Sequence, residues 1–383
     1  MNRIVRGWWL SFGLLLATGG ADAARGRMQV LYSFCGDART CCPDTAGCVT
    51  GDDPVDLVVG RDGAYYGTAG SIVYRMDPDT RAVSVLHRFD GEREGVPAYM
   101  TLAAGSDGNL YGALEGGPGG SGSLYRLSLS GKFSVVYAFG PDVIGDAFGP
   151  MAEDRQGNWY LSTVDGNAWD GGPGGAIYRI SRTPGTSSAI ARTLHVFNDP
   201  IQVANGLVFA ADGRLYGTTR VFRQEDGERG NGIVYRITSD GVFTVLHVFD
   251  GGSNGKGKPY AALTVGRDRA LYGIAGEMIF RVDLSGRFNV LSTNAGPAPS
   301  SPLVQFTDGN LYGAAMTSHR CLIIRLSRKG DYRVLMEYPR TIEPNNCGQL
   351  MTRGSDNALY GTMLDSGPSR NGSIFRYVPP PLE

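Results

Sequence analysis

Short apolar stretches, separated by clusters of Gly, Asp and Ser, recur along most of the chain. Each recurrence carries Leu-Tyr-Gly or a variant of it, follows a turn signal, and precedes a second apolar stretch that closes on an arginine. The tyrosine of this pattern occurs seven times, at Tyr66, Tyr111, Tyr160, Tyr216, Tyr272, Tyr312 and Tyr360. The closing arginine also occurs seven times, at Arg75, Arg126, Arg179, Arg236, Arg281, Arg325 and Arg376. A period of about 50 residues built from short strands is typical of a β-propeller, in which each repeat forms one four-stranded blade. The pattern therefore predicts an all-β fold, a seven-bladed β-propeller.

The fifth repeat shows how one blade divides into strands. Its apolar runs cover residues 259–265, 270–273, 278–282 and 288–291, and each is bounded by turn residues. Such runs, rich in aromatic and β-branched residues, are typical of strands. Between the first and second run, most repeats carry Asp-Gly or a related turn. We interpret these acidic residues as turn chemistry rather than metal ligands, because Asp and Gly tolerate the positive φ of a tight hairpin.

The two ends of the chain predict how the ring closes. Six repeats end in a fourth, outer strand, but the seventh runs from Arg376 directly into a triple proline. Residues 29–34 have the missing pattern and precede the first repeat. We therefore predict that the N-terminal strand closes the last blade, which removes the free sheet edges at the seam.

The first 23 residues have the composition of a signal peptide. Arg3 and Arg6 precede an apolar run at residues 8–17, and the small residues Ala21 and Ala23 form a cleavage site. The run is about ten residues long, whereas a membrane-spanning helix needs about 20. We expect cleavage before Ala24, secretion to the extracellular space or the periplasm, and one propeller domain over residues 24–383. We expect no integral membrane segment.

The charge balance excludes one class of partner. The chain has 36 basic and 37 acidic residues and a formal net charge of −1. Proteins that bind nucleic acid usually carry a large basic excess. We therefore expect no nucleic-acid partner, and we further expect no cofactor and a monomeric state.

A consensus emerges when the repeats are compared: a strand ending in Leu-x-x-Phe, then Asp-Gly-Asn-Leu-Tyr-Gly, a Gly-Gly loop, and a strand ending in Tyr-Arg-Leu. Residues 107–127 fit it best, whereas the third repeat has Leu161 in place of the glycine. This consensus resembles the GloVer tandem-repeat family of secreted bacterial proteins, over nearly the whole mature chain. The resemblance implies the propeller fold, but the family has no established activity.

Propeller topology separates the connections between strands onto two faces. The connections between blades and those between the second and third strands share one face, here called the loop face. The short hairpins share the opposite face, here called the turn face. Long and chemically varied segments concentrate on the loop face. Loops on a rigid scaffold often carry binding residues, so the concave centre of the loop face is the expected site.

All six cysteines map to the loop face. They are Cys35, Cys41, Cys42, Cys48, Cys321 and Cys347. An even number of cysteines in an exported chain predicts disulfides. A zinc site is the alternative, although the spacing matches no common ligand pattern. We therefore expect disulfides and no metal.

Three residues of the loop face are least explained by the repeat pattern and are candidate ligand-binding residues. His319 and Arg320 precede Cys321, and Trp169 lies in an acidic loop. A histidine can act as a general base, and a loop tryptophan can stack on a sugar ring. The alternatives are a solvated histidine and a tryptophan packed against a neighbouring blade. The other histidines, His87, His195 and His247, share one position in the outer strand and are expected to be structural.

Two classes of function remain open. The first is a non-catalytic secreted protein that binds a glycan, peptide, protein or surface component through its loop face. The second is a carbohydrate-active enzyme. It would be a polysaccharide lyase with His319 as the candidate catalytic base, or a loop tyrosine in its place, and an arginine that neutralises a uronate, or it would be a glycosidase with paired loop carboxylates. We favour the first class, because the sequence has no histidine cluster, no nucleophile motif and no metal-ligand spacing.

Overall fold

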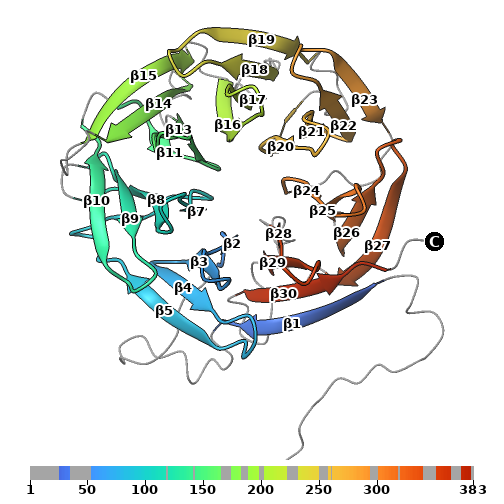
Figure 1. Ribbon diagram of the computed structural model, residues 1–383, viewed down its shortest axis with the longest axis horizontal. Helices are drawn as coiled ribbons and strands as arrows, with labels where there is room; N and C mark the ends of the chain where they lie inside the picture. Colours follow the sequence, from blue (N-terminus) through green and yellow to red (C-terminus); the bar gives the residue numbers. More distant parts are fainter. Residues whose placement is uncertain are drawn as a thin grey trace, which may run out of the picture.

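The computed structural model describes residues 26–34, 53–117, 120–140, 143–164, 174–182, 189–197, 202–221, 232–249, 258–259, 261–293, 301–317, 320–339, 351–363 and 372–380. These ranges contain strands β1 to β30 and no helix. Accordingly, no described helix is long and apolar enough to cross a membrane. Figure 1 shows seven sheets arranged in a ring around a central axis. The predicted all-β, seven-bladed β-propeller is confirmed.

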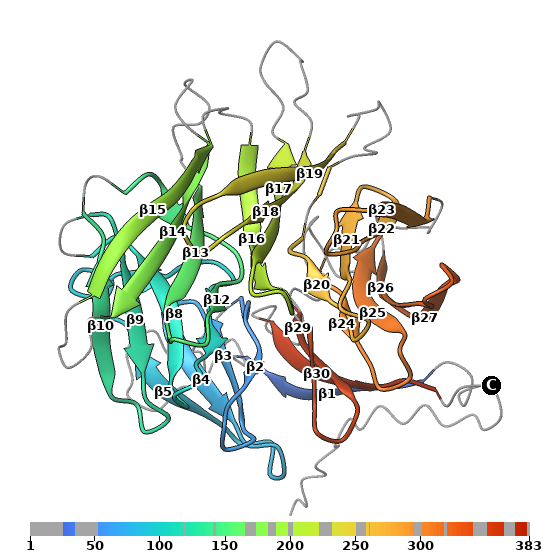
Figure 2. The same cartoon turned by 45° about the horizontal axis from the view of Figure 1, so that its top comes forward.

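Each sheet is one blade, and its strands follow one another from the axis to the rim (Figures 1 and 2). Blade one contains β2 (Val58–Val59), β3 (Tyr65–Ala69), β4 (Ile72–Met76) and β5 (Val83–Arg88). Blade two contains β6 (Val96–Pro97), β7 (Ala103–Ala104), β8 (Leu110–Glu115), β9 (Ser123–Leu127) and β10 (Phe133–Ala138). Blade three contains β11 (Asp146–Ala147), β12 (Ala152–Glu153), β13 (Trp159–Val164), β14 (Gly175–Arg182) and β15 (Ala189–Phe197). Blade four contains β16 (Gln202–Phe209), β17 (Leu215–Val221), β18 (Ile233–Ile237) and β19 (Phe243–Val248).

The remaining three blades complete the ring. Blade five contains β20 (Thr264–Val265), β21 (Leu271–Ala275), β22 (Met278–Val282) and β23 (Phe288–Ser292). Blade six contains β24 (Val304–Gln305), β25 (Leu311–Met316), β26 (Arg320–Leu326) and β27 (Tyr332–Pro339). Blade seven contains β28 (Met351–Arg353), β29 (Leu359–Met363), β30 (Ser373–Val378) and, as its outermost strand, β1 (Arg27–Ser33).

The N-terminal strand closes the ring as predicted. Strand β1 pairs antiparallel with β30, from Arg27 opposite Val378 to Ser33 opposite Ser373 (Figure 1). Phe34 follows β1, is fully buried, and contacts the ring of Tyr74 in blade one at 5.1 Å between centroids. The first residues of the domain therefore hold blade seven together and also tie it to blade one.

The innermost strands are shorter than the sequence suggests. Residues 259–265 read as one strand, but only Thr264–Val265 form β20, with an isolated bridge between Pro259 and Ala275. Pro259 pairs with Ala275 and Thr264 pairs with Tyr272. The inner segment has more residues between Pro259 and Thr264 than β21 has between Tyr272 and Ala275. An inserted residue leaves part of a strand unpaired and bends it, which explains why the ladder is interrupted here.

In five blades the glycine of Leu-Tyr-Gly makes room for an aromatic ring from the next strand, whereas Gly313 of blade six faces Leu303 and Ile324. A Cβ at Gly67 would overlap the Tyr74 hydroxyl, and a Cβ at Gly112 would overlap the Tyr125 hydroxyl. In blade three the glycine is replaced by Leu161, which lies opposite Tyr178. There the Tyr178 hydroxyl instead accepts a hydrogen bond of 2.8 Å from the Ile144 N–H. The exceptional repeat thus keeps its aromatic residue but gives it a different partner.

The hydrophobic core is divided among the junctions between blades. Seven clusters of buried side chains each combine residues of two neighbouring blades. Trp159 of blade three, for example, is buried, and its ring centroid lies 4.6 Å from that of Tyr111 in the preceding blade. No blade buries its faces alone, which is the general condition of repeat architectures.

Candidate functional site

The structure describes one of the three candidate binding residues in detail. Arg320 is exposed and begins β26, at the loop face of blade six. Trp169 and His319 lie outside the described residues, as do all the cysteines except Cys321. Cys321 itself is buried, with 2% of its surface exposed. The roles of these residues in ligand binding therefore stay predictions.

The strands that flank the candidates belong to distant blades. Trp169 falls in the sequence between β13 and β14 of blade three, whereas Arg320 begins β26 of blade six. Figure 1 shows these blades on opposite sides of the ring. A single small ligand held by both positions would have to reach across the ring. We therefore treat blade six as the better defined part of the candidate site.

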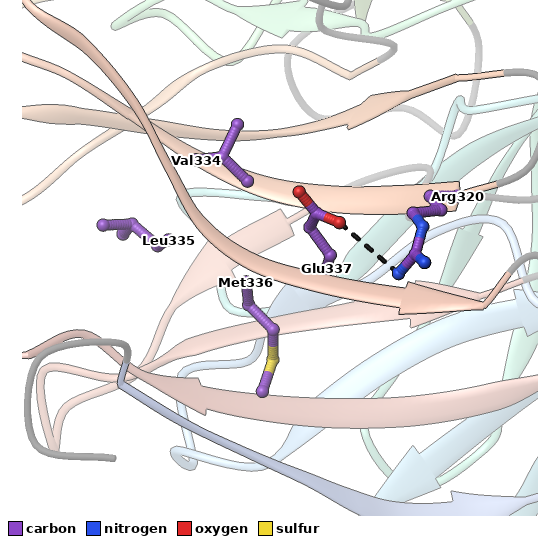
Figure 3. A pocket seen from close by; sticks show the side chains of 5 residues that line it. All are labelled: Arg320, Val334, Leu335, Met336 and Glu337. Atoms are coloured by element: carbon purple, nitrogen blue, oxygen red, sulfur yellow. Dashed lines mark ion pairs between the residues drawn. The ribbon is translucent and has the colours of Figure 1, made fainter. Parts of the chain in front are cut away.

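A cavity of about 320 Å³ lies beside Arg320 on the outer side of blade six. Its walls are formed by Arg320 of β26 and by Val334, Leu335, Met336 and Glu337 of β27 (Figure 3). The guanidinium of Arg320 lies 3.4 Å from the Glu337 carboxylate, and both side chains remain about half exposed, at 57% and 51%. An accessible ion pair beside apolar side chains offers both donors and acceptors to a ligand.

The turn face carries a second repeated arrangement that the sequence patterns did not reveal. In each blade the Leu-Tyr-Gly tyrosine donates a hydrogen bond to an Asp of the preceding hairpin, at 2.7 to 3.0 Å. The seven carboxylates belong to Asp62, Asp107, Asp154, Asp212, Asp268, Asp308 and Asp356. In four blades the closing arginine forms an ion pair with the same Asp. The two sequence anchors, Tyr and Arg, are therefore parts of one cluster.

The electrostatics of these clusters follow from their hydrogen bonds. Partial burial raises the pKa of Asp268, but hydrogen bonds from Arg281 and Tyr272 outweigh it, so its pKa is below the usual value. Burial and the hydrogen bond to Asp62 raise the pKa of Tyr66 to about 12. The Asp268 carboxylate is thus held charged and the Tyr66 hydroxyl neutral at physiological pH. We interpret the clusters as stabilising the hairpins, because in every blade the Asp carboxylate is bound by the tyrosine hydroxyl of the following strand.

The repeated histidines have a structural role, as expected. His195 and His247 lie on the outer strands β15 and β19, stacked on Phe243 and Phe288 of the next blade at 3.8 and 3.6 Å between centroids. His87 stacks on Phe133 in the same way, at 5.0 Å, and also lies 3.1 Å from Glu94. Burial lowers the pKa of His195. Imidazoles packed on phenyl rings therefore join neighbouring blades.

Two buried polar side chains lie near the inner ends of the blades. Asp56, completely buried beside β2, accepts a 2.6 Å hydrogen bond from the Thr68 hydroxyl at Oδ2, while its Oδ1 has no hydrogen-bond partner. Desolvation by burial raises the Asp56 pKa to about 7. Asn205, in blade four, donates from Nδ2 to Thr218 Oγ1 and to the Pro259 carbonyl. Asp56 is thus an acid that the fold holds largely protonated below neutral pH.

Comparison with known families now identifies the repeats. The family model described as the Gloeobacter/Verrucomicrobia repeat matches residues 53–278 and 151–375. The chain belongs to this family. The resemblance predicted from the repeat consensus is confirmed. No curated protein matches the sequence.

Solved structures share the fold at low sequence identity. The chain is similar to a streptogramin B lyase, with a TM-score of 0.63 and 15% identity, covering 94% of this chain and 99% of the other. It is also similar to a catalytically inactive virginiamycin B lyase from Staphylococcus aureus with quinupristin, with a TM-score of 0.61 and 18% identity over 85% and 95% of the two chains. A third match is the extracellular domain of a putative hybrid two-component system from B. thetaiotaomicron, with a TM-score of 0.58 and 11% identity over 86% and 38%. At these identities the likeness establishes the propeller fold alone.

Proposed function

We propose that this repeat protein is an exported, non-catalytic binding module that contacts a glycan or peptide ligand through the loop-face end of blade six. The observation that supports this function is the cavity beside Arg320. It combines an accessible ion pair, Arg320 with Glu337, and an apolar wall that includes the half-exposed Val334 (Figure 3). Its volume of about 320 Å³ lies at the lower end of the usual range for ligand pockets.

The chemistry of the cavity suits recognition. The Arg320 guanidinium can donate hydrogen bonds to hydroxyl or carbonyl oxygens, and the Glu337 carboxylate can accept them from hydroxyl or amide groups. Sugar rings and extended peptides present such groups next to apolar C–H surface. The outer strand β27 holds four of the five lining residues and pairs with β26, with a register shift at Leu335. A preformed wall reduces the ordering cost of binding.

The competing hypothesis is a lyase or glycosidase. Its support is the shared fold with lyases, which at this level of identity carries no active-site correspondence. His319 is the candidate base in that hypothesis, since the other histidines are packed on phenylalanine rings. The two hypotheses differ in what happens to the ligand after it binds.

One screen separates the hypotheses. Purified protein is presented with neutral polysaccharides, acidic polysaccharides and a peptide array, and both retention and new reducing or unsaturated ends are measured. A binding module retains a ligand without forming product. Sustained product formation by the native protein, lost by about a hundredfold in His319→Ala, would establish the enzyme instead.

The site assignment is tested with the ligand that the screen retains. Arg320→Ala should weaken binding about fivefold or more, because arginine side chains in pockets often dominate binding energy. Arg93→Ala is the matched control, since Arg93 also lies on the loop face and its side chain is 87% exposed. Equal affinity of the Arg320→Ala variant and the native protein would place the ligand elsewhere.

A further inference from the structure

The near-neutral charge of the whole chain conceals a separation of charge between its two faces. The chain has a net charge of −1, yet exposed arginines and lysines gather on the hairpins of the turn face. The described part of the loop face carries mainly acidic side chains, which include Asp90, Glu92, Glu115, Asp146 and Glu277. Local charge, rather than total charge, determines which partners a surface attracts.

The basic side chains are densest on blades five to seven. We call the following six residues the basic sector: Arg267, Arg269, Arg287, Arg328, Lys329 and Arg353. All six are exposed. They occupy the β20–β21 and β22–β23 hairpins of blade five, the β26–β27 hairpin of blade six, and the end of β28 in blade seven. Three consecutive blades therefore contribute to one continuous part of the turn face.

The carboxylates of the same hairpins neutralise this sector only in part, because its six basic side chains lie near three carboxylates that are bound by neutral donors, Asp283, Asp308 and Asp331. Asp268 and Asp356 are each bound to a tyrosine hydroxyl and to the closing arginine of their own blade. Asp308 accepts from Tyr312 and Asn310, and Asp283 accepts from Ser285. Among the described residues, none of the six basic side chains takes part in an ion pair.

Contacts between hairpins hold the sector in one arrangement. The Arg267 N–H donates to Gln305 Oε1 at 2.6 Å, which joins blade five to blade six. Thr307 Oγ1 lies 3.0 Å from Asn357 Oδ1, which joins blade six to blade seven. The Arg328 guanidinium donates to the Gly309 carbonyl at 3.2 Å. The basic side chains therefore extend from hairpins that are hydrogen-bonded to one another and not from independent loops.

We propose that the basic sector binds an acidic polysaccharide, with the sector's guanidinium and ammonium groups contacting its carboxylate or sulfate groups. Arginine presents a planar set of donors that matches such oxyanions. A ring of cations spread over three blades fits an extended chain with regularly repeated negative charges. The proposal is independent of the function proposed for the loop face.

Two other negatively charged partners, single-stranded nucleic acid and the membrane surface, fit the sector less well. Proteins that bind single-stranded nucleic acid use exposed aromatic rings as stacking platforms, whereas Tyr272 and Tyr312 of the sector blades are buried. Proteins that lie on membranes insert large apolar side chains. The described exposed large hydrophobic residues of blades five and six, Val290 and Val334, lie on the outer strands β23 and β27 instead of the hairpins.

Binding is tested with polygalacturonate and heparin, which carry carboxylates and sulfates, by titration calorimetry at two salt concentrations. The native protein should bind at least one of them, and more weakly at high salt, because ionic contacts are screened. The variant Arg287→Gln, Lys329→Gln, Arg353→Gln should lose about tenfold or more in affinity. Its melting temperature should stay close to that of the native protein, since all three side chains are exposed.

The matched control removes three charges from blades one and two of the same face: Arg61→Gln, Arg81→Gln, Lys132→Gln. It should keep nearly the native affinity. Absence of binding by the native protein, or an equal loss in the control variant, would overturn the proposal. So would tighter binding to single-stranded DNA or to phosphatidylglycerol vesicles than to either polysaccharide.

Discussion

Asp56 shows how one buried residue can control the pH dependence of the whole fold. Its carboxyl is completely buried beside Thr68, and burial raises its pKa from 3.8 to about 7. Hydrogen bonds from the Thr68 hydroxyl and the Leu102 amide oppose the shift only in part. In the unfolded chain the same group ionises near its ordinary value. Folding therefore favours the protonated form.

The first prediction concerns this residue. Because the folded-state pKa is raised, the contribution of Asp56 to stability is fully present below about pH 4 and is lost as the pH rises to about 7. A shift from 3.8 to about 7 corresponds to a loss on the order of 4 kcal/mol. Asp56→Asn mimics the neutral form and should unfold at a higher denaturant concentration than the native protein at pH 8.

Urea denaturation of both proteins from pH 4 to pH 8 checks this prediction. The difference in unfolding free energy between variant and native protein should grow as the pH rises, and then level off above about pH 7. Other titrating groups contribute equally to both proteins and cancel in the difference. A difference that is independent of pH would show that Asp56 is not protonated in the folded state.

At the scale of the strand, the side chains of β1 and of the residue after it differ in how deeply they are buried. Phe34 follows it, is completely buried, and contacts Tyr32 and Tyr74 at ring-centroid distances of 5.1 Å. The Phe34 N–H donates to the Gly372 carbonyl at 3.0 Å. Val30, on the same strand, is 49% exposed. Closure of the ring therefore depends on particular side chains and not only on the β1–β30 ladder.

The second prediction follows from this asymmetry. Phe34→Ala should lower the free energy of unfolding by about 3 to 5 kcal/mol, as for other large-to-small changes in a core. Val30→Ala, the control on the same strand, should cost less than about 1 kcal/mol. Thermal and chemical unfolding of the two variants provide the measurement. Similar losses in both would mean that β1 is held by its backbone alone.

Much of this architecture can be predicted from the sequence because the repeat constrains it. The tyrosine and arginine anchors locate the second and third strands of every blade, and the N-terminal closure follows from the missing outer strand. The interrupted inner strands could not be predicted, since apolar periodicity does not report an inserted residue. The Asp–Tyr–Arg clusters also escaped prediction. Their members are distributed over a hairpin and two strands, and the Asp alone is explained by turn propensity.

The candidate site was less predictable than the fold for a physical reason. Repetition identifies residues that packing requires, whereas ligand-binding residues depart from the repeat and share no pattern. Arg320 was singled out from sequence by its position beside Cys321, but its partner Glu337 was not. Glu337 lies on a different strand, and only the register of β26 against β27 brings the two side chains together. The same limit applies to the basic sector, which is assembled from three blades.

At the scale of the whole molecule, the ring is stabilised by junctions between neighbours. Each of the seven core clusters joins two blades. The ring is closed because β1 completes blade seven. The loss of one junction between blades would therefore open the ring. Covalent links across the seam between the last and first blades would oppose that opening. The sequence has cysteines both before the first blade and in its last third, so such links can form across the seam.

The final prediction is that the protein carries such links. At least one disulfide should join the N-terminal group, Cys35 to Cys48, to Cys321 or Cys347. Support comes from the burial of Cys321, of which 2% is exposed. A bridge of this length restrains the unfolded chain by roughly 3 to 5 kcal/mol in the loop-entropy treatment. Mass spectrometry of the non-reduced protein should find the linked peptides and at most traces of free thiol, and reduction should lower the melting temperature. Bound zinc together with six titratable thiols after denaturation would contradict the prediction, because metal ligation and disulfide formation use the same sulfur atoms.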